Sequence, residues 1–190
     1  GTACVRPRGG PVGRNLPGAI PSGRITASSG PYGAGQARVA RAIYGVNRYF
    51  GGRVRFQGQA IETLPPRERL KLGIGFVPQG RCNFPLMTVR ENLELGTFTL
   101  RGAAASQAIE RVLAQFPLLT AKLPVLAGNL SGGEQQILET AMVLEAGPEL
   151  LLPDEPSLGF SPRNQGTTFA TISDPRPPRR LRHRQMVVLE

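Results

Sequence analysis

The sequence predicts an α/β fold, and three observations support this. Segments typical of short strands alternate along the chain with segments of helical periodicity. A β-prone stretch at residues 20–27 is followed by a glycine-rich loop and then by a helical pattern over residues 38–44. The length, 190 residues, allows one sizeable core but is short for two independent domains. We therefore expect one domain, with a smaller subdomain at most.

The remaining elements are expected in this order. Residues 1–19 are rich in glycine and proline without apolar periodicity, which predicts a poorly ordered segment. A strand is predicted at 54–56, a helix opening at Pro65-Pro66 and running to Leu72, and a buried strand at 74–77. Apolar residues then recur at helical spacing, which predicts a helical subdomain at about 82–128.

The last third of the chain has three predicted parts. Ser131, with Glu134 three residues later, has the spacing of a capping box and predicts a helix through about Ala146. Residues 150–152 are an apolar strand that ends in Asp154-Glu155. Residues 163–190 are predicted to be a basic, degenerate tail, because residues 175–184 hold five arginines and three prolines.

The glycine-rich loop, "GPYGAGQA" at 30–37, is the first chemical motif. A phosphate-binding P-loop has the pattern G-x-x-x-x-G-K-[ST]; Gly30 and Gly35 have this spacing, but Gln36 and Ala37 stand where lysine and a hydroxyl residue are needed. Glycines at 30, 33 and 35 allow a sharp turn that points backbone N–H groups at phosphate oxygens. The loop is thus predicted to bind an anion weakly, without lysine charge or a hydroxyl ligand for Mg²⁺.

Three further motifs occur in order: "GFVPQG" at 75–80, "LSGGEQQ" at 130–136 and "LLLPDEPSLG" at 150–159. They resemble, in this order, the Q-loop, signature and Walker B motifs of ABC-transporter nucleotide-binding subunits. The glycine loop stands at the position of the Walker A motif of that family. Residues 64–96 make the chain most similar to the cassettes of branched-chain amino-acid importers. The resemblance covers residues 20–162.

The resemblance implies a P-loop NTPase (RecA-like) core with a β-rich flank and a helical subdomain. It also implies ATP and Mg²⁺ as cofactors, a second ABC cassette and transmembrane permease subunits as partners, and a cytoplasmic location on the inner face of the plasma membrane. The D-loop of the family matches residues 157–162 here. Only residues 163–165 separate it from the strand-like segment 166–172, where the family has a helix. The fold is therefore expected to be C-terminally incomplete.

By the same resemblance, each motif residue has an expected role. Asp154 and Gln79 would hold Mg²⁺, and Glu155 would orient or deprotonate the attacking water. Pro153 departs from the family pattern and puts the placement of Asp154 in question. The residues expected to contact ATP are Gly30, Gly33, Gly35, Gln36, Ala37 and Gln79 in the chain's own site, and Ser131, Gly132 and Gly133 in the partner's site.

Composition leaves two alternatives open. The formal net charge is +10, and residues 1–61 hold nine arginines and no acidic residue, so a basic nucleic-acid-binding module is one alternative, although no reader motif or aromatic interleaving supports it. The other is a decayed or truncated cassette copy without function, which would explain the lost lysine and hydroxyl together. No apolar run is long enough for a membrane span and no signal peptide is evident, so the chain is expected to be soluble.

Overall fold

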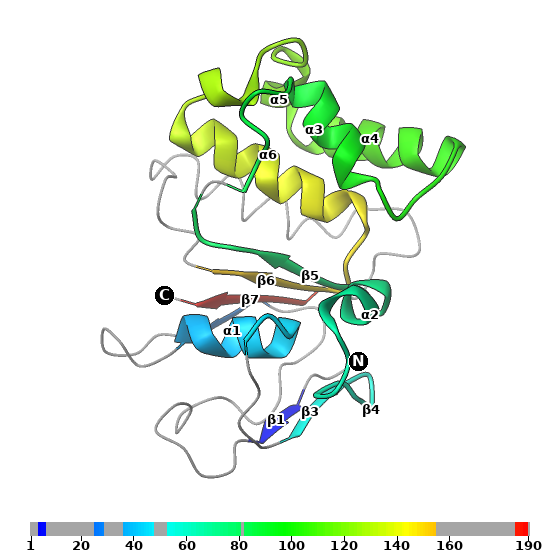
Figure 1. Cartoon of the computed structure of the whole chain (residues 1–190), viewed down its shortest axis with the longest axis vertical. Helices are drawn as coiled ribbons and strands as arrows, with labels where there is room; N and C mark the ends of the chain where they lie inside the picture. Colours follow the sequence, from blue (N-terminus) through cyan, green and yellow to red (C-terminus); the bar gives the residue numbers. More distant parts are fainter. Residues whose placement is uncertain are drawn as a thin grey trace. The chain divides into compact units, whose positions relative to one another are not determined.

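The structure is a computed structural model that describes residues 4–6, 25–28, 36–47, 53–80, 82–154 and 185–189 (Figure 1). The chain divides into two compact units. The described part of the first comprises the residues up to 76, together with 149–154 and 185–189. The described part of the second is 77–148 without residue 81.

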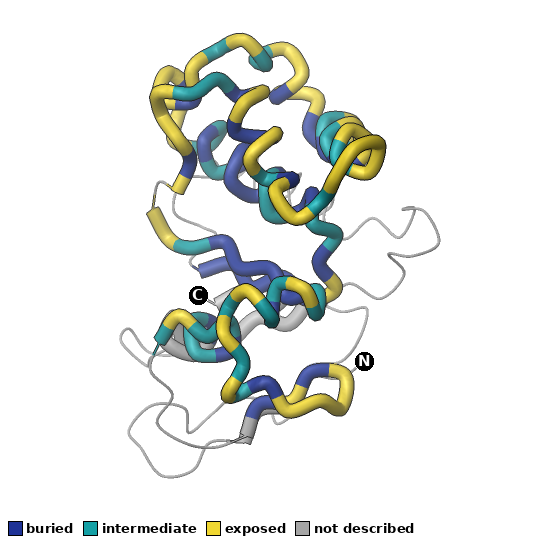
Figure 2. The backbone as a smooth tube through the Cα atoms, turned by 45° about the vertical axis from the view of Figure 1, so that its right-hand side comes forward, coloured by how far each residue is buried: buried dark blue, intermediate teal, exposed yellow. Residues whose placement is uncertain are grey.

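The first unit contains a four-stranded sheet in the order β2-β7-β6-β5 (Figure 1). Its strands are β2 (Ile25–Ser28), β7 (Gln185–Leu189), β6 (Leu150–Pro153) and β5 (Ile74–Val77). Strand β7 is parallel to β2, with Ile25 opposite Met186, and parallel to β6, with Leu151 opposite the same methionine. All residues of β5 and β6 are buried (Figure 2).

A second, antiparallel sheet in the same unit has the order β1-β3-β4. It comprises β1 (Cys4–Arg6), β3 (Arg53–Phe56) and β4 (Gln59–Ala60). The two residues that join β3 to β4, Gln57 and Gly58, have φ values of 51° and 82°. Positive φ at both central positions is the geometry of a type I′ hairpin turn. The antiparallel sheet is the β-rich flank that the family resemblance implies.

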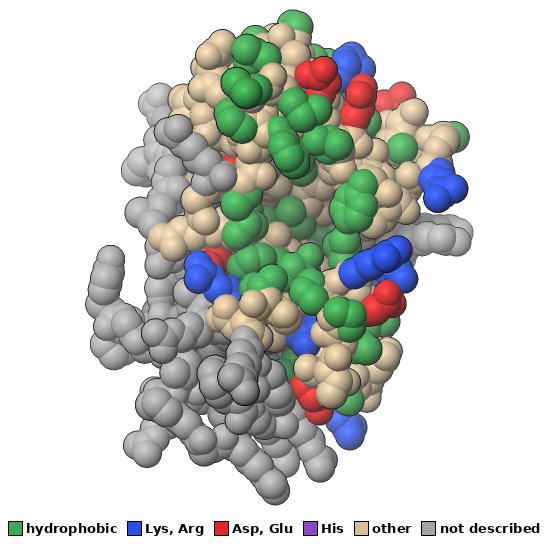
Figure 3. Space-filling view, viewed as in Figure 1, with side chains coloured by type: hydrophobic (Ala, Val, Ile, Leu, Met, Phe, Trp, Pro, Cys, Tyr) green, Lys and Arg blue, Asp and Glu red, His purple; other side chains and the backbone are tan. Residues whose placement is uncertain are grey.

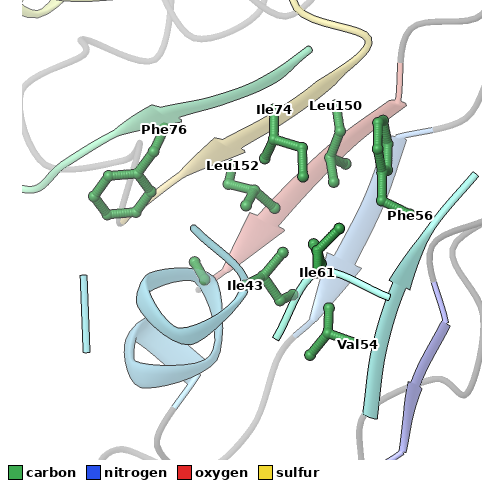
Figure 4. Close-up of a cluster of buried hydrophobic side chains, with 9 residues drawn as sticks. Ile43, Val54, Phe56, Ile61, Ile74, Phe76, Leu150 and Leu152 are labelled. Carbon is green, nitrogen blue, oxygen red and sulfur yellow. The ribbon is translucent and has the colours of Figure 1, made fainter. Parts of the chain in front are cut away.

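A hydrophobic core holds helix α1 (Gln36–Tyr44) against these strands (Figure 4). Ile43 of α1 packs with side chains of β3, β5 and β6, and the Tyr44 ring stacks on Phe76 with centroids 5.2 Å apart. The buried members of this cluster are Ala40, Ile43, Val54, Phe56, Ile61, Ile74, Phe76, Leu150 and Leu152. The core therefore fixes α1 relative to the strand that ends at Asp154.

The C-terminus of α1 is closed by Arg69, from helix α2 (Pro66–Lys71). Arg69 is 3% exposed, and its guanidinium donates to the carbonyls of Ala42 and Ile43, both at 2.7 Å. It also donates to the carbonyls of Leu64 at 2.8 Å and Glu62 at 3.1 Å. A cation at the negative end of a helix dipole satisfies carbonyls that have no intrahelical partner.

The second unit is helical in its described part. It contains α3 (Val89–Gly96), α4 (Ala103–Gln115), α5 (Pro117–Thr120), the 3₁₀ helix η1 (Ala127–Asn129) and α6 (Gly132–Glu145). Helix α6 packs against α3 and α4, and its buried residues include Leu138, Ala141 and Leu144. This helical unit is larger than the predicted subdomain at 82–128, because it includes α6.

Two short strands lie in segments for which the sequence predicts no regular structure. Cys4–Arg6, placed in the poorly ordered N-terminal segment, is a strand paired with β3. Gln185–Leu189, placed in the basic tail, lies between β2 and β6 in the sheet. Both strands are defined by partners far away in the sequence, and "MVVL" at 186–189 is an apolar run typical of a buried parallel strand. Residues 163–184 of the predicted tail lie outside the described residues.

Candidate functional site

The glycine loop lies between strand β2 and helix α1, which is the strand–loop–helix order that a P-loop requires. Gly30, Gly33 and Gly35 lie outside the described residues. Gln36 and Ala37 are the first two residues of α1. Their backbone N–H groups thus belong to the first turn of a helix, where such groups have no intrahelical partner and can face an anion.

Asp154 follows the last residue of β6 and forms an ion pair with Arg41 of α1. The Arg41 Nε and Nη2 atoms lie 2.9 and 2.8 Å from Asp154 Oδ2. The Asp154 side chain is 0% exposed, whereas that of Arg41 is 37% exposed. Pro153 does not prevent this placement, because the pairing of β6 with β7 is made at Leu150 and Leu151. Glu155 lies outside the described residues.

The signature residues open helix α6 in the second unit. Ser131 is the N-cap: its Oγ accepts from the Glu134 amide at 3.4 Å, and the Glu134 carboxylate accepts from the Ser131 amide at 2.9 Å. This reciprocal arrangement is the predicted capping box. Gly132 and Gly133 are the first two helical residues, so their N–H groups lie at the positive end of the helix dipole.

The capping carboxylate is held in turn by Lys122. The Lys122 Nζ atom lies 2.6 Å from Glu134 Oε1. The hydrogen bond from Lys122, followed by the one from the Ser131 backbone, lowers the pKa of Glu134. The ionised carboxylate is the form that accepts both bonds, so the start of α6 is fixed at neutral pH.

Gly132 has no packing reason to be glycine within the described chain. A Cβ built on Gly132 would meet no atom within 4 Å, and its φ is not in the left-handed region. Alanine would be better than glycine at this exposed helical position. A bare backbone at an open helix N-terminus is suited to close approach by a ligand.

Gln79 follows β5 by two residues and is exposed. The segment after it is anchored by Glu139, a buried residue of α6. Glu139 Oε1 accepts from the amide of Cys82 at 2.7 Å and from the side-chain amide of Asn83 at 2.9 Å. Burial, and secondarily the Glu139 charge, raises the pKa of the exposed Cys82 thiol. The loop that carries Gln79 thus has one fixed end.

The predicted site residues belong to two units. Gln36, Ala37 and Asp154 belong to the first unit, where Arg41 links α1 to the carboxylate. Ser131, Gly132, Gly133 and Gln79 belong to the second unit. The sequence did not indicate a role for Arg41 or Lys122. Arg41 follows Ala37 by four residues, which places both on one face of a helix, but its pairing with a residue 113 positions away has no sequence signal.

The residues present do not fit the Mg²⁺ site that the resemblance implies. Position 37 offers no hydroxyl, and one oxygen of Asp154 is already committed to a guanidinium. Among the described residues, no group of three or more His, Cys, Asp or Glu side chains could hold a metal ion. The other carboxylate oxygen, Asp154 Oδ1, is buried and has no hydrogen-bond partner among the described residues.

Comparison with known proteins gives a consistent result. The profile of the ABC transporter family matches residues 14–158. The chain is 38% identical over 153 residues to the probable branched-chain amino acid transport ATP-binding protein LivF of Archaeoglobus fulgidus, covering 80% of this chain and 65% of that protein. It is 36% identical over 143 residues to the high-affinity branched-chain amino acid transport ATP-binding protein BraG of Pseudomonas aeruginosa, covering 75% and 61%. The chain thus spans less than two thirds of either relative.

Solved structures support the fold. The ADP conformation of MJ1267, an ATP-binding cassette of an ABC transporter, superposes with a TM-score of 0.77 at 23% identity, covering 90% of this chain and 72% of that one. A nucleotide-free ATP-binding cassette from an ABC transporter superposes with a TM-score of 0.73 at 22% identity, covering 100% and 79%. Within the described ranges, no helix has the length and apolar character needed to cross a bilayer.

Proposed function

Because the chain belongs to the ABC transporter family, we propose that it acts as the ATP-binding subunit of an importer, with a weakened nucleotide site of its own and an intact signature. Attachment to the cytoplasmic face of the membrane, through permease subunits, is part of this proposal. Branched-chain amino acids are the proposed cargo, because LivF and BraG are named as branched-chain amino acid transport ATP-binding proteins. The observation that carries the proposal is the start of α6. Ser131 forms a capping box there, and no described atom lies within 4 Å of a Cβ built on Gly132.

The weakness of the chain's own site follows from two missing contacts. Gln36 carries no charge and Ala37 has no hydroxyl. A hydrogen bond to a charged group contributes roughly 1.5–3 kcal/mol, so two lost contacts reduce affinity by up to about 3–6 kcal/mol, or two to four decades. Asp154 and Glu155 stay the proposed catalytic residues of this loop, and hydrolysis there is accordingly proposed to be very slow.

The helix start at the signature supports a role in capping a phosphate in trans. Gly132 and Gly133 present backbone N–H groups, and Lys122 and Glu134 hold the helix start. We therefore propose that this chain completes the ATP site of a second cassette. A pair with an intact cassette would contain one competent site and one impaired site.

The helical unit also offers a surface for a membrane partner. Phe84, Leu86 and Leu126 are 50%, 88% and 41% exposed. The segment that carries the first two lies against the third, because Thr88 bridges Leu126 and the Gly128 amide donates to the Pro85 carbonyl at 2.9 Å. Apolar side chains gather on the surface of this unit (Figure 3). Such a patch favours contact with an apolar partner, here a permease subunit.

The test is ATP hydrolysis by a reconstituted pair of this chain with an intact cassette of the family. Gly132→Leu adds bulk at an exposed position where a Cβ meets no described atom within 4 Å, and it should abolish hydrolysis at the partner's site while the thermal unfolding midpoint stays within a few degrees. Ala103→Leu is the matched control, since Ala103 is the exposed first residue of α4. Unchanged hydrolysis with Gly132→Leu, or with the more drastic Ser131→Arg, would refute the trans role.

A second experiment addresses the chain's own loop. Gln36→Lys with Ala37→Thr should raise ATP affinity, by up to about two to four decades if both contacts form. A folded double variant with unchanged affinity would contradict the proposal that only the loop chemistry was lost. Absence of any cooperative unfolding transition in the parent chain would instead favour a decayed copy.

A further inference from the structure

Glu139 is a buried carboxylate on helix α6. It is 5% exposed, and its neighbours Leu138 and Ala141 on the same helix are 0% exposed. A carboxylate is rarely buried without partners, because its transfer out of water costs far more than that of an apolar side chain. The carboxylate at this position is therefore accounted for by the hydrogen bonds that it accepts.

One oxygen of Glu139 accepts three hydrogen bonds from two consecutive residues. The Cys82 amide donates to Oε1 at 2.7 Å, and Asn83 donates from its backbone amide at 3.3 Å and from its side-chain amide at 2.9 Å. Hydrogen bonds to an ionised carboxylate are shorter and stronger than those between neutral groups. Because two of the three donors are backbone amides, the carboxylate holds the main chain at residues 82–83 and not only a side chain.

The residues on either side of 82–83 belong to the predicted site and to the proposed partner surface. Gln79 comes three residues before Cys82, and three residues span at most about 11 Å. Phe84 follows Asn83 directly and is 50% exposed. The bonds to Glu139 therefore limit how far both Gln79 and Phe84 can move away from α6.

Helix α6 connects this anchor to the signature. Glu139 follows Gly132, the first residue of α6, by seven positions, which is about two turns or roughly 10 Å along the helix axis. The helix is continuous over this span and packs against α3 and α4. Closely packed elements transmit a displacement instead of absorbing it. A displacement of the main chain at residues 82–83 is thus transmitted to the N–H groups at the start of α6.

We propose that Glu139 is a positioning residue that joins residues 82–83, after Gln79, to the signature at the start of α6. A partner that contacts this segment and a phosphate that the signature caps then act on one rigid piece, so by thermodynamic linkage each affects the other. This inference rests on the proposed function, because it requires that the signature caps the nucleotide of a second cassette. Glu139 is assigned no contact with nucleotide and no chemical step.

The test follows the mobility of a nitroxide attached to Cys82. The chain has two cysteines, so Cys4→Ser leaves Cys82 as the labelling site, and this residue is exposed. The labelled chain is paired with an intact cassette of the family, and electron paramagnetic resonance is recorded with and without ATP. Capping of ATP by the signature should immobilise α6 and, through Glu139, lengthen the rotational correlation time of the nitroxide at least two-fold.

Point variants of the labelled chain assign this response to Glu139. Glu139→Ala should remove the response, whereas Glu139→Gln should retain at least half of it, because glutamine keeps an accepting oxygen and loses only the charge. Gly132→Leu should also remove it, since ATP is then not capped. Glu110→Ala, which removes an exposed carboxylate of α4, is the matched control and should leave the response unchanged. Where Glu139→Ala does not fold, Asn83→Asp places a second carboxylate against Oε1 and should weaken the response at least two-fold.

Three outcomes would overturn the inference, and they are distinguishable. ATP hydrolysis by the pair without any change in nitroxide mobility refutes the link but leaves the proposed trans role intact. A response of equal size in the parent and in folded Glu139→Ala assigns the link to other contacts. A folded parent chain whose pair neither hydrolyses ATP nor shows the response refutes the trans role, and the inference with it.

Discussion

Lys122 and Glu134 form an ion pair with Nζ and Oε1 2.6 Å apart, and the same carboxylate caps the start of α6. The pair is partly shielded, with side-chain exposures of 34% and 18%. Glu134 thus makes two contacts. It completes the capping box with Ser131, and it binds the turn that carries Lys122 to the start of the helix. The geometry of the signature depends on this lysine, although the lysine is no part of the motif.

Removing the lysine should weaken the start of α6. Lys122→Met should lower the free energy of unfolding by about 0.5–1 kcal/mol, and Glu134→Ala by about 1–2 kcal/mol because the cap is lost as well. Lys71→Met is the matched control, since its pair with Glu68 is exposed on both sides and should contribute less than about 0.5 kcal/mol. Urea denaturation measures all three. Equal effects at positions 122 and 71 would contradict the structural role.

The same pair predicts a pH dependence. The pKa of Glu134 is lowered, chiefly by Lys122, so its stabilising contribution is complete above the unfolded-state pKa near 4.5 and is lost as the pH falls through the lowered value. The free energy of unfolding of the parent should therefore fall more steeply between pH 5 and 3 than that of Lys122→Met. Parallel pH profiles from denaturation at each pH would refute this.

Arg69 gives the largest predicted loss of stability. Four backbone carbonyls accept from its buried guanidinium, and Arg69→Met would leave them without that donor. The expected loss is about 3–5 kcal/mol, the upper range for a buried hydrogen-bonded charge. Arg69→Lys should recover only part of it, because an ammonium cannot span all four acceptors. Arg67→Met, at an exposed position of the same helix, should change stability by less than about 0.5 kcal/mol.

Much of the fold was predictable because its signals are local. The buried strand at 74–77 is an apolar run, and the start of α6 is a serine with a glutamate three residues later. Strand β7 was missed because an arginine-rich segment precedes it and its partners are β2 and β6, far away in sequence. Strand β1, only three residues long, also has a partner that is distant in the sequence.

The candidate site divides in the same way. The motif residues could be named from sequence because each motif is contiguous. Arg41 and Lys122 could not, since their roles come from Asp154 and Glu134, which they reach through space. The inability of position 37 to bind a metal was evident from the missing hydroxyl, but the presence of a guanidinium on Asp154 required the structure.

The side-chain amide of Asn92 holds the segment from Phe84 to Thr88 by hydrogen bonds. The residue is fully buried; its Oδ1 accepts from the Phe84 amide at 2.8 Å, and its Nδ2 donates to the carbonyls of Phe84 at 3.0 Å and Thr88 at 2.9 Å. Asn92→Asp keeps the shape but replaces the donor by a carboxylate oxygen. It should cost about 3 kcal/mol or more at pH 7, whereas Asn129→Asp, at an exposed position, should be nearly neutral. Thermal unfolding of the two variants checks this.

Glu145 predicts a second pH dependence, opposite in sign to that of Glu134. It lies near the end of α6, 1% exposed, and both carboxylate oxygens are buried without a hydrogen-bond partner among the described residues. Burial raises the pKa of Glu145 to about 9. The folded chain therefore keeps this proton at neutral pH, whereas the unfolded chain releases it above about pH 4.5.

The free energy of unfolding should consequently decrease as the pH rises from about 5 to 9, by up to about 1.4 kcal/mol per pH unit from this group. Glu145→Leu removes the proton and the buried polar group, so it should be more stable than the parent at pH 8 and lose the slope. Gly96→Ala should be destabilising at every pH, because an added Cβ would collide with Glu145 Oε2 and lie 3.0 Å from backbone atoms of Met142. Urea denaturation at pH 5.5, 7.0 and 8.5 decides, with the exposed Glu110→Leu as control; a slope that persists in Glu145→Leu would assign it to another group.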